Sequence, residues 1–459
     1  MLRFCTLLFI LGLLAPPVAP AQTLRVSDNG RYLVRPDGTP FFWLGDTAWE
    51  LLHRFTREEA DFYFKKRAEQ GFNVIQAVVL AELDGLTEPT PEGYLPLHDN
   101  DPTRPRADYL AKVDALIDGA ARHNLYIGLL PTWGDKVNGD RAPAIFTPAN
   151  ARTYGRLLAE RYRNRPNLIW ILGGDRFVDT PERLAIWRAM AAGVQEGLGG
   201  ADRGLLTFHP RGGRSSSPEF HQDDWLDLNL WQTGHCRDAY EHEAIRGDYA
   251  RTPAKPVING EPIYEAHPVC FNVEDMGHSN AHDVRRAAYL SVFAGACGHT
   301  YGCHSVWQAY TPARRPINAP LQPWNESLEL PGASQLRHLR ALIESRPVLA
   351  RVPNQALLPD APHPAELIQA TQGTDYLFVY SGLGRPFRLN LGTLPGARVR
   401  GYWYNPRTGE SQDAGTFDNR GQQTFKPPRV QRDGLDWVLV LDDASRSYPA
   451  PGTRPYAAP

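Results

Sequence analysis

The sequence predicts an α/β protein in which a (β/α)8 (TIM) barrel is followed by a smaller C-terminal β-sandwich domain. Between residue 41 and about residue 347, short β-branched or aromatic runs alternate with longer stretches of helical periodicity. These make about eight strand–helix units in roughly 300 residues, the number and size expected of such a barrel. Beyond Pro347 the apolar residues recur with period two, which is typical of antiparallel strands.

The predicted barrel strands are short apolar runs, and a polar or aromatic cluster follows nearly every one. They span 41–44, 74–79, 125–130, 168–172, 205–208, 226–230, 257–260 and 299–302. Helices are predicted at 57–70, 108–123, 149–162, from Pro181 onwards, 281–296 and 333–344. A doubly wound open sheet is the competing arrangement, but it usually carries a glycine-rich phosphate loop after an early strand, and this sequence has none.

The C-terminal part has the spacing of a small sandwich. Strands are predicted at 376–380, 387–391, 397–404 and 437–441, with a turn at 405–409. We therefore expect the barrel domain to cover residues 22–347 and the sandwich to cover residues 348–446. Residues 447–459, which are rich in proline and alanine, are expected to form a flexible tail.

Residues 1–21 have the features of a signal peptide. Arg3 precedes an apolar run at 7–14, and Ala19-Pro20-Ala21 offers a small-residue cleavage site. The run is well short of the ~20 residues that a membrane anchor needs. The protein is therefore expected to be exported, to the periplasm or outside the cell, with no membrane partner. In that compartment its cysteines could pair as Cys297–Cys303 or Cys236–Cys270, or stay as buried thiols.

Composition limits the class of function. Hydrophobic residues make up 42% and charged residues 22%, as in soluble globular proteins, and the formal net charge is −2. A chain so close to neutrality has no electrostatic basis for binding nucleic acid. The sequence predicts no particular oligomeric state.

Two acidic residues follow predicted strands on opposite sides of the barrel mouth, Asp175 after the fourth strand and Glu261 after the seventh. Barrel enzymes carry their catalytic residues at these strand ends. Glycosidases use two carboxyl groups, about 5–5.5 Å apart for retention and about 6.5–9.5 Å apart for inversion. The structural alternatives are that Asp175 caps a turn or pairs with Arg176, and that Glu261 binds backbone amides in the turn at 259–262. Both coincidences together are less favoured than a catalytic pair.

Aromatic and polar residues near the same strand ends predict a sugar-binding cleft. The aromatic candidates, whose faces would stack on a sugar ring, are Trp49, Trp133, Trp231, Tyr264 and Trp307. The polar candidates, which would bind hydroxyl or acidic groups, are Asp46, Gln76, Asp135, Arg176, His209, His235 and His304. Any one of these residues, considered alone, would more often have a structural role than a ligand-binding one.

Motifs for metal or serine chemistry are missing from the sequence. The segment 242–246 has arginine where a zinc-protease helix needs its second histidine, and the segment 302–306 is not a nucleophile elbow. We therefore expect no metal and no organic cofactor, and a metal-dependent esterase or protease is disfavoured.

Four short segments together resemble the apiosidase-like glycoside hydrolases, family 140. They are Phe42-Trp43-Leu44-Gly45-Asp46-Thr47-Ala48-Trp49, Gln70-Gly71-Phe72-Asn73-Val74-Ile75-Gln76, Trp170-Ile171-Leu172-Gly173-Gly174-Asp175 and Asn259-Gly260-Glu261-Pro262. The resemblance implies a retaining glycosidase of the large (β/α)8 clan, with Asp175 as acid/base and Glu261 as nucleophile. It also makes an apiose-linked side chain of pectic rhamnogalacturonan II the leading substrate.

One departure from the wider clan concerns the acid/base. Most members use glutamate preceded by asparagine, whereas this chain has Gly174-Asp175, and the shorter side chain needs a different approach to the leaving oxygen. The segment 403–409 is similar to the collagen-binding-type sandwich that often accompanies the family, and we expect that domain to buttress the barrel. The competing function is a non-catalytic carbohydrate-binding protein on a glycosidase scaffold, which the presence of both carboxylates disfavours.

Overall fold

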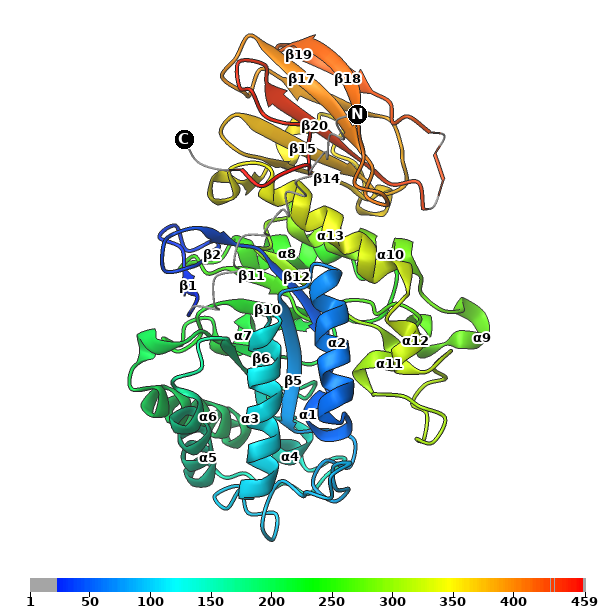
Figure 1. Cartoon of the computed structure of the whole chain (residues 1–459). Helices are drawn as coiled ribbons and strands as arrows, with labels where there is room; N and C mark the ends of the chain where they lie inside the picture. Colours follow the sequence, from blue (N-terminus) through cyan, green and yellow to red (C-terminus); the bar gives the residue numbers. More distant parts are fainter. Residues whose placement is uncertain (1–22, 430, 433, 457–459) are drawn as a thin grey trace, which may run out of the picture.

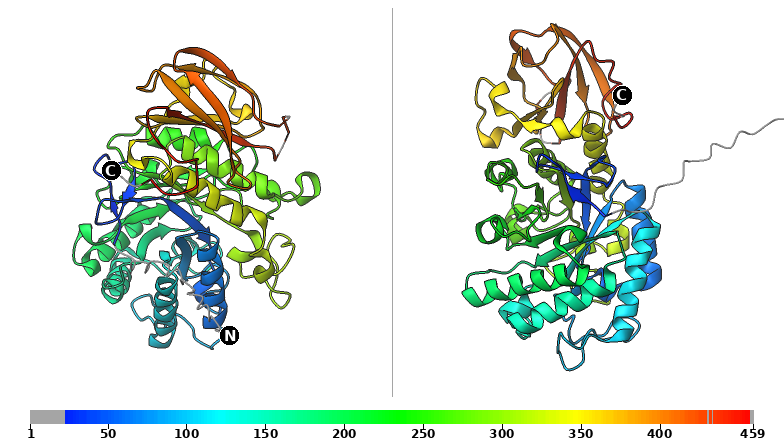
Figure 2. Two further views of the ribbon diagram at one scale, coloured as in Figure 1. Left: turned by 45° about the horizontal axis from the view of Figure 1, so that its top comes forward. Right: turned by 90° about the vertical axis from the view of Figure 1, so that its left-hand side faces the viewer.

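The computed structural model describes residues 23–429, 431–432 and 434–456, and it consists of a barrel with a β-rich domain stacked at one end (Figure 1). Turned views show the same two-part arrangement, with the C-terminal domain in orange and red (Figure 2). The predicted signal peptide at residues 1–21 lies outside the described residues. None of the described helices has the length and apolar character needed to cross a membrane.

Eight parallel strands form the barrel, in the order in which they occur along the chain. They are β4 (Trp43–Thr47), β5 (Val74–Leu80), β6 (Tyr126–Thr132), β7 (Leu168–Gly173), β8 (Leu206–His209), β10 (Asn229–Gln232), β11 (Val257–Asn259) and β12 (Gly298–Tyr301). At the seam between β8 and β10, the amide of Asp227 donates to the carbonyl of Leu206 over 2.9 Å. The nearly closed barrel confirms the predicted fold and excludes the open sheet. A short strand, β9 (Arg214–Ser215), pairs antiparallel with β10.

Helices cover the outside of the barrel, so the strands are buried on both faces and read as continuous apolar runs. The longer helices are α2 (Arg57–Glu69), α3 (Ala107–Arg122), α5 (Pro148–Tyr162), α6 (Pro181–Leu198), α8 (Glu241–Tyr249), α10 (Ala281–Phe293) and α13 (Pro331–Glu344). Short helices lie in the connecting loops: α1 (Leu51–Arg54), α4 (Asp135–Asn138), α7 (Ser217–Phe220), α9 (Val273–Met276), α11 (His304–Trp307) and α12 (Trp324–Ser327). Capping boxes at Thr56 and Thr147 fix the starts of α2 and α5.

Three further sheets complete the described part of the fold. A small antiparallel sheet of β1 (Arg25–Val26), β2 (Leu33–Val34) and β3 (Pro40–Phe41) precedes the barrel. In the C-terminal domain, one sheet has the order β13 (Val352–Pro353), β14 (Ile368–Gln372), β15 (Tyr376–Ser381), β20 (Trp437–Asp443), β17 (Arg398–Tyr404) and β18 (Ser411–Asp418). The other sheet pairs β16 (Phe387–Leu391) with β19 (Gly421–Phe425). The predicted second domain of β-strands is confirmed.

One hydrophobic core runs from the barrel onto the barrel-facing side of the sandwich, and the two sheets of the sandwich enclose a second core of their own. Tyr289 of α10 stacks on Tyr380 of β15 with ring centroids 4.9 Å apart, and Phe293 lies 6.0 Å from Phe378. In Figure 1 the sandwich sits above α10 and α13, whereas α1 and α4, which follow barrel strands, lie at the other end of the barrel. The sandwich therefore packs against the barrel away from the loops that follow these strands.

Residues 447–456, expected to be a flexible tail, lie along the junction of the two domains. The carbonyl of Pro449 accepts a hydrogen bond from Arg346 (3.1 Å), and the hydroxyl of Tyr448 donates to Asp375 (2.9 Å). The amide of Tyr456 donates to the carbonyl of Glu344 over 2.7 Å. These contacts tie the described part of the segment to both domains.

Candidate active site

A cavity of about 470 Å³ opens at the carboxyl ends of the barrel strands, and loops from all eight strands contribute to its walls. Its lining residues are Trp49, Glu82, Trp133, Asp140, Arg141, Asp175, Arg176, Phe177, Arg211, Gly212, Gln232, Gly234, His235, Glu261, Tyr264, His267, Phe271, Trp307, Ile317 and Asn318. The structure thus brings together both predicted carboxylates, four of the five predicted aromatic residues, Arg176 and His235.

A Gly-Gly-Asp turn places Asp175 at the cavity. Gly173, Gly174 and Asp175 all have positive φ, at 92°, 130° and 49°. A Cβ atom on Gly173 would lie 2.2 Å from the carbonyl oxygen of His209, and one on Gly174 would lie 2.8 Å from the amide nitrogen of Gly134. Only glycine fits these two positions, so the residues before Asp175 are dictated by the close approach of the backbone.

The carboxyl group of Asp175 is held at both oxygens. Arg176 donates to Oδ2 over 3.2 Å, and the amide of Gly212 donates to Oδ1 over 3.4 Å. Burial, followed by the negative charge of Glu261, raises the pKa of Asp175 above its ordinary value, although His209 and Arg176 act in the opposite direction. Asp175 therefore keeps its proton to higher pH than an exposed aspartate.

Glu261 lies just beyond β11, between two imidazoles. The Nε2 atom of His209 is 2.9 Å from its Oε2, and the Nε2 atom of His235 is 3.3 Å from its Oε1. Burial alone would raise the pKa of Glu261, but the two imidazoles outweigh burial and lower that pKa to about 2. Glu261 is therefore a carboxylate over almost the whole pH range in which a protein stays folded.

His209 contacts both Asp175 and Glu261, which lie on opposite sides of the cavity, but it does not line the cavity itself. Its Nδ1 atom accepts a hydrogen bond from the backbone amide of Asp175 over 3.4 Å. An imidazole that accepts at Nδ1 carries its proton on Nε2, which is the atom that faces Glu261. One side chain at the end of β8 thus links the loop of the fourth strand with the carboxylate after the seventh.

The aromatic side of the cavity is built around Trp49. Its indole N–H donates to the hydroxyl of Tyr264 over 3.1 Å, and its ring centroid is 5.0 Å from that of Trp133. Phe177 and Phe271 also line the cavity and are 44% and 63% exposed, and the guanidinium of Arg211 lies 4.1 Å from the ring centroid of Phe177. Apolar ring faces beside carboxylates form the kind of surface that a sugar ring binds.

Three predicted residues lie off the cavity, and for Asp46 and Trp231 the reason is that neighbouring strand residues point to opposite faces. Asp46 is fully buried on the outer side of β4, where Tyr63 and Arg67 of α2 donate to it. Trp231 packs on an apolar cluster that includes Ile245, while the next residue, Gln232, lines the cavity. His304 is buried, and its Nε2 atom contacts the carbonyl groups of residues 317 and 318.

Two further predicted residues, Gln76 and Asp135, also lie off the cavity. Gln76 donates from Nε2 to the carbonyl of Gly260 over 2.9 Å, and so fixes the backbone just before Glu261. Asp135 is buried and pairs with Lys136 at 2.9 Å.

The cavity also contains residues that the sequence did not single out. They include Glu82, Asp140, Arg141, Phe177, Arg211, Gln232, His267 and Phe271. Most lie several residues into a loop, where no local pattern marks them. Gln232, Glu82 and Arg211 are the exceptions, since each lies at or within two residues of the end of a barrel strand. That position is a signal that could have found them.

A disulfide between Cys236 and Cys270 joins two loops of the cavity wall. Cys236 follows His235, Cys270 precedes Phe271, and the amide of Cys270 donates to the carbonyl of His235 over 2.9 Å. Of the two predicted pairs, this one is present in the structure, and Cys297 and Cys303 are buried thiols.

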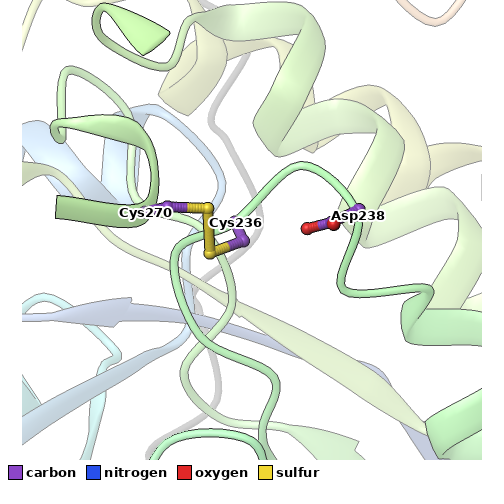
Figure 3. A group of neighbouring side chains, drawn as sticks. All are labelled: Cys236, Asp238 and Cys270. Carbon is purple, nitrogen blue, oxygen red and sulfur yellow. A yellow bond between two sulfur atoms is a disulfide. The ribbon is translucent and has the colours of Figure 1, made fainter. Parts of the chain in front are cut away.

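Asp238 lies close to the same sulfurs, and the ligand atoms of the three residues are within 4.8 Å of one another (Figure 3). Among the described residues, these three side chains have ligand atoms close enough together to hold a metal ion. Because both sulfurs are bonded to each other, neither can act as a thiolate ligand. The grouping does not fit a metal site.

Loss of the disulfide should destabilise the protein. It closes a loop with a sequence separation of 34, so replacing both cysteines by serine should cost roughly 2–4 kcal/mol of unfolding free energy. Thermal unfolding with and without reductant would measure the effect. The wild type and a Cys297→Ala control should both lose stability on reduction, whereas Cys236→Ser/Cys270→Ser should be insensitive to reductant. Equal Tm values for the wild type and the double variant would contradict the expectation.

Comparisons with known proteins agree with this geometry. Residues 27–350 match the family model "Apiosidase-like, catalytic domain", and residues 352–442 match "Putative collagen-binding domain of a collagenase". A solved glycoside hydrolase is 34% identical, with a TM-score of 0.87, and the match covers 93% of this chain and 98% of the other. A glycoside hydrolase family 5 structure from Bacteroides vulgatus is also 34% identical, with a TM-score of 0.86, and the match covers 93% and 94%. A comparison with curated proteins gave no match.

Proposed function

Since the chain belongs to the apiosidase-like family of glycoside hydrolases, we propose that it is an exported, retaining enzyme. Its proposed substrate is an apiose-linked side chain of pectic rhamnogalacturonan II. Glu261 acts as the nucleophile and Asp175 as the acid/base. The contrast between the two carboxyl groups carries the proposal: Glu261 is held ionised, while Asp175 is in an environment that favours its protonated form.

The reaction proceeds by double displacement. A carboxylate oxygen of Glu261 attacks the anomeric carbon while Asp175 gives its proton to the departing glycosidic oxygen, so a glycosyl ester forms and the alcohol leaves. Asp175, now ionised, then takes a proton from a water molecule whose oxygen attacks the same carbon. The ester bond breaks, Glu261 leaves as a carboxylate, and Asp175 again carries a proton.

The surrounding side chains have supporting roles. The N–H groups of His209 and His235 face the oxygens of Glu261 and orient the nucleophile. Trp49, Trp133, Tyr264 and Trp307 supply ring faces for the sugar, and Arg176 keeps the acid/base in place. The other predicted ligands, Asp46, Gln76, Asp135, Trp231 and His304, act through the packing around the cavity.

Export is part of the proposal because residues 1–21 have the pattern of a signal peptide. The Cys236–Cys270 disulfide is consistent with it, since disulfides persist in oxidising compartments.

The pH dependence follows from the two carboxyl groups. The reactive form has Glu261 ionised and Asp175 protonated. Because the pKa of Glu261 is about 2 and that of Asp175 is raised, kcat/KM should stay high in mildly acidic solution and fall as pH rises through the pKa of Asp175. Initial rates between about pH 3 and pH 9 would measure this. A rate that increases steadily from acid to neutral pH would argue against these roles.

Hydrolysis of an apiose-containing pectic oligosaccharide tests the function. The wild type should release apiose, and proton NMR of the first product formed should show the anomeric configuration of the substrate. The Asp175→Ala/Glu261→Ala double variant, checked for folding, serves as the blank. Release by the double variant would refute the mechanism, an inverted first product would refute retention, and release of a different sugar would refute the substrate.

A further inference from the structure

Arg211 is a cationic residue of the cavity that the mechanism above does not use. It lies two residues beyond the end of β8, is exposed and lines the cavity. Its guanidinium carbon lies over the ring of Phe177, 4.1 Å from the ring centroid. The face of an aromatic ring attracts a cation in this position, which limits the orientations that the long arginine side chain adopts.

The other acidic and arginine residues that line the cavity already have partners. The pairs are Arg176 with Glu82 (3.0 Å), Asp140 (2.6 Å) and Asp175 (3.2 Å), Arg141 with Glu82 (3.8 Å), and Glu261 with the two imidazoles described above. Among the residues that the structure describes, Arg211 has no carboxylate partner. Its N–H groups are therefore available to an anionic group of a ligand.

Both members of the Arg211–Phe177 pair are held beside the acid/base. The amide of Gly212, the residue after Arg211, donates to Oδ1 of Asp175 over 3.4 Å. Phe177 follows Asp175 by two residues, and its carbonyl accepts a hydrogen bond from the side chain of Asn138 over 3.1 Å. An acid/base must reach the glycosidic oxygen, so the leaving part of the substrate lies on this side of the cavity.

The charge of the cavity in its reactive form also favours an anionic ligand. Asp175 is then protonated, and Glu82, whose pKa burial raises to about 7, is largely protonated in mildly acidic solution. The lining groups that remain charged are the two carboxylates of Asp140 and Glu261 and the three guanidinium groups of Arg141, Arg176 and Arg211. A negatively charged leaving group therefore enters a cavity with one surplus cation.

We propose that Arg211, held against Phe177, is a specificity-determining residue that binds the carboxylate of an acidic sugar in the leaving group. A planar guanidinium offers two parallel N–H groups, which match the two oxygens of a carboxylate. The preferred substrate is then one in which the released sugar is linked to a uronic acid. The inference rests on the proposed role of Asp175 as acid/base, which sets the side on which the leaving group lies.

The test compares two substrates that release the same sugar, one from a uronic acid and one from the methyl ester of that acid. The wild type should hydrolyse the acid with a kcat/KM roughly tenfold above that of the ester, because only the acid offers a carboxylate to Arg211. Arg211→Gln, which removes the charge, should bring the acid-to-ester ratio close to one. Arg211→Lys, which keeps the charge without the paired N–H groups, should give an intermediate ratio. Added salt should lower the wild-type ratio more than that of Arg211→Gln.

Arg141→Gln is the matched control, because Arg141 is the other exposed arginine of the cavity wall and already lies near Glu82. Its acid-to-ester ratio should stay within about twofold of the wild-type value, since water screens so exposed a charge. Phe177→Leu should lower the ratio partway, because the guanidinium of Arg211 then loses the ring that orients it.

A wild-type ratio near one, or a wild-type ratio retained by Arg211→Gln, would overturn the inference. An equal decrease in Arg141→Gln and Arg211→Gln would also overturn it, because the enzyme would then respond to the net charge of the cavity and not to Arg211. Full activity of Asp175→Ala on both substrates would instead refute the proposed function. If the wild type releases a sugar other than apiose, the two leaving groups are attached to that sugar and the same ratio remains the test.

Discussion

Replacing Glu261 with alanine should lower kcat/KM by roughly 10⁴-fold or more, the loss expected when the nucleophile of a covalent mechanism is removed. The reason is specific to this carboxylate: two imidazoles hold it ionised beside the cavity. Two other carboxyl groups of the cavity, Asp175 and Glu82, have pKa values that are raised instead. Initial rates on an apiose-containing oligosaccharide would measure the loss.

The matched control is Glu265→Gln, four residues further along the chain. Glu265 is also buried, but it accepts from Tyr301 at 2.6 Å and from the amide of Gly332 at 3.1 Å and does not line the cavity. That variant should lose stability more than activity. Added azide, small enough to occupy the space left by alanine at 261, should restore turnover and give a glycosyl azide of inverted configuration. Retention of more than a tenth of wild-type activity by a folded Glu261→Ala would assign the nucleophile elsewhere.

The positions of the two carboxylates were predictable because they depend on strand ends alone. Asp175 and Glu261 each follow a buried strand within two residues, and a closed parallel barrel brings all such positions to one face. The strands and helices of the barrel were also predictable from the sequence. The strands are continuous apolar runs, and the helices repeat apolar residues at helical spacing. Strands β18 and β19 were missed because most of their residues are exposed and polar, which erases the period-two signal.

The direction of individual side chains was not predictable in the same way. A residue at or near a strand end faces either the cavity or the helices, and a difference of one residue decides between them. Asp46 and Trp231 were predicted to face a ligand and instead face α2 and the cluster beside α8. Glu82 contacts Arg176, which lies 94 residues away in the chain, so no local pattern predicts that these two residues meet.

Substitution of Asp436 by asparagine should be among the most destabilising single changes in the chain. Arg285 of the barrel donates to both oxygens of this carboxylate, at 3.2 and 2.8 Å, and Arg407 of the sandwich contacts it at 3.0 Å. Asparagine would leave two guanidinium groups at a buried interface without their counter-ion, which costs roughly 3–5 kcal/mol. The measurement is the free energy of unfolding in denaturant, with Asp360→Asn as control. Asp360 pairs with Arg388 at a site where both side chains are about half exposed, so its loss should cost less than about 1 kcal/mol.

The pH dependence of stability should change with the same substitution. Burial opposes the ionisation of Asp436, but Arg285, His282 and Arg407 outweigh it and lower the pKa of the carboxyl group in the folded state. A lowered pKa stabilises the fold above the pKa of the unfolded chain, and that contribution is lost as pH falls through the folded value. The gap between wild type and Asp436→Asn should therefore be widest near neutral pH and shrink in acid. Because one hydrophobic core joins the barrel to the facing side of the sandwich, the variant should still unfold in one transition, although the sandwich also has a core of its own. A separate early transition of the sandwich would mean that the domains are coupled mainly by this ion pair.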